Sequence, residues 1–178
     1  NVKPDMMVFA KGINSGYVPL GATMFNERIE EAFKGHADAG FMHGNTYQAH
    51  PLACAAALAN IDILLKERLT ENAGEVGAYF LARLSDLAER QKHIGNVRGK
   101  GLMIGVELVK DKGTKEKFPD ATLFGHKVAR RCRDHGVLIR NIYDTFIISP
   151  PLILTKDQVD RIVEVMDEAL SYETKQNG

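Results

Sequence analysis

The chain has 178 residues, of which 44% are hydrophobic and 26% are charged, and its 23 basic side chains balance 23 acidic ones. This composition is typical of a globular protein with one domain or parts of two, and it excludes a disordered chain. A formal net charge of zero removes the usual electrostatic argument for a nucleic-acid or membrane partner. Two cysteines cannot build a disulfide scaffold, so we expect a cytoplasmic protein.

The chain starts without an initiator methionine or the pattern of a signal peptide, and we therefore expect a piece of a larger protein. The apolar run 6–10 predicts a short buried strand, because it is bounded by Pro4 and Gly12. Glycine and proline predict a loop over 12–22, and a short helix is expected over 27–33. A single strand cannot form a sheet, so we expect its partners to lie outside this chain.

A long loop over 35–50 leads to Pro51, which suits the first turn of a helix because its missing N–H is not needed there. The Ala- and Leu-rich residues 52–69 predict that helix. Apolar residues at helical spacing predict a second helix over 73–91, with its start at Thr70 or Asn72.

The remainder of the chain mixes strands and helices. The predicted elements are a strand over 102–109, a polar loop over 110–120, a helix over 121–135 ended by Gly136, strands over 137–140 and 145–149, and a final helix begun by the capping box Thr155–Gln158. The order α-β-α-β-β-α over 70–178 predicts a small α/β layer structure. Residues 1–69 are then the end of a different domain.

Lys11 is the first candidate for chemistry, because it follows a predicted buried strand and precedes a glycine-rich turn. Burial disfavours the ammonium form of a lysine, and a neutral amine can attack a carbonyl carbon. The alternative is a lysine that simply leaves the strand for solvent.

Two further residues are candidates for binding. Thr46 lies five residues before Pro51, so its hydroxyl could bind a phosphate near the start of a helix; alternatively, it bonds its own backbone. Arg140 ends a predicted strand, where a guanidinium could clamp a substrate carboxylate. The alternative is a surface ion pair, with Asp144 as the partner.

Other chemistry-bearing residues have simpler interpretations. His43 and His50 do not have the spacing of a metal site, so we expect no metal. The basic run 130–133 is predicted to be a solvated helix face. Cys54 lies in an Ala-rich helix without an adjacent base and is expected to be a packing residue.

Four segments stand in a specific order along the chain: residues 4–5 with 10–12 and 16–22, then 43–47 with 50–58, then 97–103, and finally 149–152. Together they resemble the motifs of the class III aminotransferases, the ω-transaminase group. The resemblance covers most of the chain. It implies the C-terminal part of a PLP-dependent transferase of fold type I, in which residues 1–69 end the large PLP-binding domain and residues 70–178 form the small α/β C-terminal domain.

The resemblance implies pyridoxal 5'-phosphate (PLP) as the cofactor, with Lys11 as the lysine that holds it covalently and carries a proton during transamination. Thr46 matches the threonine that reaches the cofactor phosphate of the neighbouring subunit, which implies a homodimer with a shared active site. Arg140 matches a mobile arginine that pairs with the substrate carboxylate. An amine or amino acid and a keto acid are the implied small-molecule substrates.

The strand 145–149 lacks the arginine that γ-aminobutyrate- and ornithine-type members usually carry there, so the chain resembles the amine or ω-amino-acid:pyruvate type. The family's aspartate for the pyridine nitrogen and its phosphate-binding loop lie upstream of the lysine. We therefore expect a missing N-terminal portion of the same enzyme, without which this chain alone is inactive. Two alternatives stay open: a PLP-dependent aminomutase of the glutamate-1-semialdehyde type, and an inactive dimerisation module.

Overall fold

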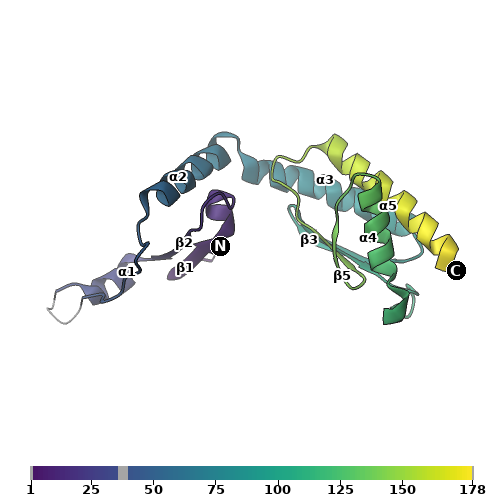
Figure 1. Ribbon diagram of the computed structural model, residues 1–178, viewed down its shortest axis with the longest axis horizontal. Helices are drawn as coiled ribbons and strands as arrows, with labels where there is room; N and C mark the ends of the chain where they lie inside the picture. Colours follow the sequence, from purple (N-terminus) through teal and green to yellow (C-terminus); the bar gives the residue numbers. More distant parts are fainter. Residues whose placement is uncertain (1, 36–39, 178) are drawn as a thin grey trace. The chain divides into compact units, whose positions relative to one another are not determined.

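The computed structural model describes residues 2–35 and 40–177, which form two compact units, Asn1–Arg68 and Leu69–Gly178 (Figure 1). The structure combines helices with antiparallel sheets, and the expected mixed α/β class is confirmed. The assignment of residues 1–69 to a PLP-binding domain and of 70–178 to a small C-terminal domain stays a prediction. Within the described residues, no helix is long and apolar enough to cross a membrane.

The first unit is a β-hairpin followed by helices. Its elements are β1 (Met6–Ala10), the 3-10 helix η1 (Lys11–Asn14), β2 (Gly21–Phe25), α1 (Glu27–Glu30), the 3-10 helix η2 (Glu31–Phe33) and α2 (Pro51–Lys66). Strands β1 and β2 are antiparallel, with Met6 opposite Phe25 and Ala10 opposite Gly21. The prediction that β1 has no partner in this chain was therefore wrong.

Two expectations from the sequence were not met in this hairpin. Pro19 and Gly21 indicated a loop, but Gly21 is the first residue of β2 and lies directly opposite Ala10. Strand β1 was expected to be buried, yet only Phe9 is partly covered and its other side chains are exposed. The apolar run therefore forms the predicted strand without the predicted burial.

Helix α2 begins as its sequence indicates. Pro51 occupies the first turn, and the Nδ1 atom of His50 accepts a hydrogen bond from the Ala53 N–H at 3.4 Å. The helix ends at Lys66, three residues before the predicted end. The predicted loop 35–50 lies partly outside the described residues, and its part 40–50 contains turns without a helix or strand.

The second unit is a four-stranded antiparallel sheet with three long helices. Its elements are α3 (Leu69–Arg90), β3 (Ile94–Lys100), β4 (Met103–Leu108), the 3-10 helix η3 (Asp120–Thr122), α4 (Phe124–Asp134), β5 (Arg140–Ile142), β6 (Thr145–Ile148) and α5 (Lys156–Asn177). The strand order is β3-β4-β6-β5. Figure 1 shows α3, α4 and α5 together on one side of this sheet.

The core of the second unit lies between the sheet and the helices. Alternate residues of β4, from Ile104 to Leu108, point into it, while Met103 is exposed. The core is built mainly of large apolar side chains; among those with no measurable exposure are Phe80, Leu84, Leu87, Val106, Phe124, Phe146, Met166 and Leu170. Alternate strand residues are buried, and each helix has an apolar face. The sheet and the helices therefore form two layers with one core between them.

Strand β3 was not predicted, because its glycines resemble loop residues. A Cβ atom on Gly95 would lie 2.6 Å from the Val109 side chain, and one on Gly99 would lie 2.6 Å from the Met103 carbonyl oxygen. These glycines permit close packing within the sheet. Strand β5 was predicted over 137–140 but spans Arg140–Ile142, so Arg140 begins the strand instead of ending it.

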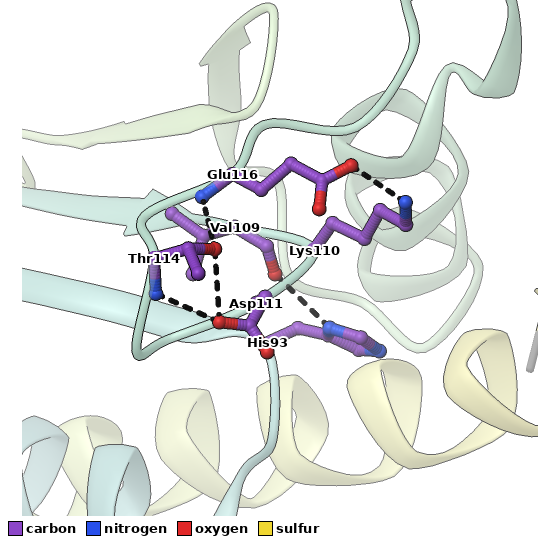
Figure 2. A network of polar contacts seen from close by, with 6 residues as sticks. All are labelled: His93, Val109, Lys110, Asp111, Thr114 and Glu116. Atoms are coloured by element: carbon purple, nitrogen blue, oxygen red, sulfur yellow. Dashed lines mark hydrogen bonds and ion pairs between the residues drawn. The ribbon is translucent and has the colours of Figure 1, made fainter.

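The polar loop after β4 is ordered by its own side chains (Figure 2). Asp111 accepts a hydrogen bond from the Thr114 N–H at 2.8 Å, and the Lys110 ammonium lies 2.6 Å from a Glu116 carboxylate oxygen. At its start, the buried His93 donates from Nδ1 to the Val109 carbonyl oxygen at 3.0 Å. The loop is therefore anchored to the core through one imidazole.

Candidate active site

Lys11 lies where strand β1 turns into η1. Its φ angle is +52°, a left-handed backbone conformation that a residue with a side chain adopts at a cost of about 1–3 kcal/mol. Its side chain is exposed in this chain, so the expected burial is not observed. The chain thus leaves the strand abruptly at the lysine, and the amine is open to a ligand.

The turn after Lys11 is closed on itself by backbone and side-chain hydrogen bonds. The Gly16 N–H donates to the Lys11 carbonyl oxygen at 3.3 Å. Asn14, which is only 1% exposed, donates to the Val18 carbonyl and accepts from the Gly16 N–H at 3.1 Å. Because both ends of its amide are used inside the turn, Asn14 fixes the path of residues 14–18.

A second asparagine holds the same turn from outside. The Asn60 amide, on helix α2, donates to the carbonyl oxygens of Gly12 at 3.0 Å and Ile13 at 3.1 Å. The Ser15 hydroxyl donates to the Asn60 amide oxygen at 2.6 Å. Sequence reasoning missed Asn60; the only signal was an asparagine on the helical face of Ala53 and Ala57, the buried residues of α2.

The backbone directly after Lys11 is open on one side. A Cβ atom built on Gly12 would have nothing within 4 Å apart from the glycine's own chain neighbours. Thr46 is exposed and lies in the turn 46–49 that leads to His50, the N-cap of α2. Within the described residues, no hydrogen bond of the Thr46 side chain is found, which leaves its hydroxyl available.

Arg140 lies in the second unit, at the start of β5, and is exposed. It borders a cavity of about 330 Å³ whose other walls are mostly apolar, with Ile139, Ile147 and Pro150 among them. The alternative, an ion pair with Asp144, is not observed; one oxygen of that carboxylate accepts a hydrogen bond from the Gly125 N–H at 2.8 Å. In the part of the chain that the structure describes, Arg140 has no ion pair, and within the first unit no hydrogen bond joins Lys11 to Thr46.

The two cysteines and the basic run differ in their surroundings. Cys54 is exposed, so the prediction of a packing residue was wrong; Ala53 and Ala57 are the buried residues of α2. Burial raises the pKa of the Cys132 thiol to about 12, which keeps it protonated. Among the described residues, no cluster of three potential metal ligands is present. In the basic run, the Arg131 guanidinium lies 3.5 Å above the Tyr172 ring.

Comparisons with known proteins identify the family of this chain. The family model for class III aminotransferases matches residues 1–170. The adenosylmethionine-8-amino-7-oxononanoate aminotransferase of Anoxybacillus flavithermus is 39% identical over the whole chain, which spans 39% of that relative's length. The chain therefore covers about two fifths of the length of such relatives.

Solved structures give the same result. An amine transaminase from an uncultivated Pseudomonas species, determined with PLP bound, is 46% identical with a TM-score of 0.87 over 95% of this chain and 38% of its own. An (S)-enantioselective ω-transaminase from Thermomicrobium roseum is also 46% identical, with a TM-score of 0.86 over 97% of this chain and 38% of its own. The chain belongs to the class III aminotransferase family.

Proposed function

We propose that the protein containing this chain is a PLP-dependent transaminase that moves an amino group from an amine or ω-amino acid to a keto acid such as pyruvate. The observation that carries this proposal is Lys11, an exposed amine on a fixed turn with open space beside it, inside a segment that matches the family. A family relationship by itself supports only the fold. The lysine amine at position 11 supports covalent chemistry with a carbonyl group.

Each candidate residue has a role in this proposal. PLP, when bound, supplies an electron sink that eases loss of a proton from the substrate carbon. Lys11 holds the cofactor covalently and later takes and returns that proton. Thr46 binds the cofactor phosphate of the partner subunit in a homodimer, through its unused hydroxyl. Other parts of the active site come from the portion of the enzyme that precedes this chain.

Arg140 is proposed to select substrates. Its guanidinium forms no ion pair with a carboxylate of the described residues, and it stands beside a mostly apolar cavity. A bidentate pair with a substrate carboxylate suits such a guanidinium, while the cavity wall suits an apolar substituent. The arrangement supports both a keto acid and an apolar amine as substrates.

Two similarities favour different amino donors. The solved amine transaminase and ω-transaminase are 46% identical to this chain, which supports an amine donor. The curated relative named adenosylmethionine-8-amino-7-oxononanoate aminotransferase is 39% identical, which makes adenosylmethionine the second candidate donor. The absence of an arginine in strand β6 argues against the γ-aminobutyrate and ornithine types and does not separate these two donors.

The test uses the protein in its full length, supplied with PLP. We expect pyruvate-dependent release of ketone from an arylalkyl amine, with slower turnover of adenosylmethionine. Lys11→Ala is expected to abolish this turnover, and Arg140→Ala to raise KM for pyruvate more than for the amine. Turnover without any keto acid acceptor would instead indicate an aminomutase, and normal turnover by Lys11→Ala would refute the assigned role.

A further inference from the structure

Lys11 occupies a backbone conformation that its own sequence does not favour. Only glycine adopts a positive φ at no steric cost, so a lysine at +52° persists only where surrounding contacts hold it. The residue that follows is Gly12, whose peptide has no side chain to lock it by packing. Something else must hold the peptides that follow the lysine.

Asn60 supplies that support from a distant part of the chain. Its amide N–H groups bond the carbonyl oxygens of the two residues directly after Lys11, at 3.0 and 3.1 Å. Ser15 donates to its amide oxygen, which fixes the orientation of the amide with the N–H groups toward the turn. All three hydrogen bonds connect one side chain of a regular helix to one turn.

Helix α2 is a suitable support for this contact. Ala53 and Ala57 are its buried residues, and Asn60 continues the same face one turn later, half-buried. Because alanine side chains are small, the helix backbone can approach η1 closely enough for the short Asn60 side chain to reach it. Sites built on regular elements hold geometry better than sites on loops alone.

We propose that Asn60 is a positioning residue: it holds the Lys11 turn in the conformation in which the lysine amine reacts with the cofactor aldehyde. The proposal rests on the proposed function. In the covalent step, the Lys11 nitrogen bonds the aldehyde carbon, and the aldehyde oxygen leaves as water. Asn60 touches neither reacting atom and acts only through the peptides of Gly12 and Ile13.

The test uses the apo form of the full-length protein, incubated with PLP and treated with borohydride at timed intervals. Borohydride delivers a hydride to the new carbon–nitrogen bond, so peptide mass spectrometry measures the rate of attachment at Lys11. Binding of pyridoxamine phosphate, which has no aldehyde and cannot react, is measured in parallel. The first measurement reports the placement of Lys11, and the second reports the rest of the cofactor site.

Asn60→Asp is the central variant, because it keeps the size of the side chain and removes the two donor groups. We expect its attachment rate to fall by at least about tenfold, because both hydrogen bonds to the Gly12 and Ile13 carbonyl oxygens are lost, with unchanged affinity for pyridoxamine phosphate. Asp62→Asn is the matched control, because it makes the opposite exchange, from a carboxylate to an amide, at an exposed residue of the same helix. Among the described residues, Asp62 pairs only with Lys66. This control should leave both quantities unchanged.

The outcomes separate the two proposals. Attachment at Lys11 in the wild-type protein, together with loss of total attachment in Lys11→Ala, supports the proposed function; unaltered total attachment in Lys11→Ala refutes it. If Lys11 reacts but Asn60→Asp reacts at the wild-type rate, or loses affinity for pyridoxamine phosphate to the same extent, the positioning role is wrong. If Asn60→Asp does not fold, Ser15→Ala decides: this exposed site loses one of the three contacts, and a wild-type rate would then overturn the proposal.

Discussion

The two units of the chain differ in what they bury. The second unit encloses a continuous core that includes Phe80, Phe124 and Phe146, each without measurable exposure. In the first unit, the buried residues among those described are Asn14, Ala53 and Ala57. One unit thus contains its own source of stability, whereas the unit with the candidate lysine does not.

The first unit also leaves large apolar side chains uncovered. Val8 is 75% exposed, Met24 61% and Leu58 67%, and they come from three different elements. Val8 pairs with Thr23 and Met24 with Met7, so the exposed apolar side chains lie on both faces of the hairpin. The comparison teaches that the unit with the candidate lysine covers few of its own apolar side chains, which fits the proposal that a preceding portion and a partner subunit complete the site.

The largest expected effect is on independent folding. Residues 69–178, produced alone, should unfold in one cooperative transition, because their core is complete within that segment. Residues 1–68 alone should show no cooperative transition. Circular dichroism during urea titration checks both fragments, and a sharp transition for residues 1–68 would contradict the comparison.

Matched phenylalanine truncations sharpen the same contrast. Phe80→Ala should lower the free energy of unfolding of the second unit by about 3–5 kcal/mol, because it opens a cavity in a close-packed core. Phe25→Ala, at a residue 46% exposed in the first unit, should leave that transition unchanged. Equal losses from both substitutions in the 178-residue chain would show that the units share one core.

Two glycines of α3 provide a smaller test within the second unit. A Cβ atom on Gly77 would lie 2.3 Å from backbone atoms of Gly101, so Gly77→Ala should cost about 1–3 kcal/mol of unfolding free energy. Gly74 has open space, so Gly74→Ala should stabilise the helix by about 0.5–1 kcal/mol. Opposite signs in urea unfolding are expected; a stabilising Gly77→Ala would refute the close helix–turn contact.

The smallest expected effect depends on pH. Burial lowers the pKa of His93 below its ordinary value of 6.5, with backbone acceptors opposing that shift and Lys92 and Lys112 adding to it. The unfolded chain then binds a proton more readily than the folded one, so this stability is complete above pH 6.5 and declines as pH falls toward the lowered folded pKa. The imidazole packs edge-on against Phe118 and Phe124, and these apolar rings contribute to its burial.

His93→Gln should reduce the decline in unfolding free energy as the pH falls below 6.5. His126→Gln, at an exposed residue, should leave that decline in place. Urea unfolding of the second unit at several pH values between 5 and 8 measures the difference. If both variants retained the wild-type slope, His93 would not be the group that links protonation to the loop after β4 (Figure 2).

Local chemistry made several features predictable from the sequence. Gly136 has a φ of +85° at the end of α4, as a helix-ending glycine should. Thr155 and Gln158 exchange the two hydrogen bonds of a capping box. Such features depend on neighbours within a few residues, so the sequence contains all the information they need.

Features that depend on distant residues were not predictable. Gly95 and Gly99 gave loop signals, because the strand β4 that packs against them comes later in the chain. Asn60 is separated from Gly12 by 48 residues, and no pattern links the two. Arg140 and Asp144 are close in sequence, yet the Asp144 carboxylate accepts a hydrogen bond from the distant Gly125 N–H. For the candidate site, the sequence therefore indicated a candidate lysine, whose role stays a prediction, but not the contacts that hold its turn.

The most direct test of the central claim is a crystal structure of the full-length protein saturated with PLP. We expect continuous electron density from the Lys11 side-chain nitrogen to the cofactor, with Asn60 bonded to the carbonyl oxygens of Gly12 and Ile13. A Lys11 side chain that is free, ion-paired and directed away from a bound cofactor would contradict the claim.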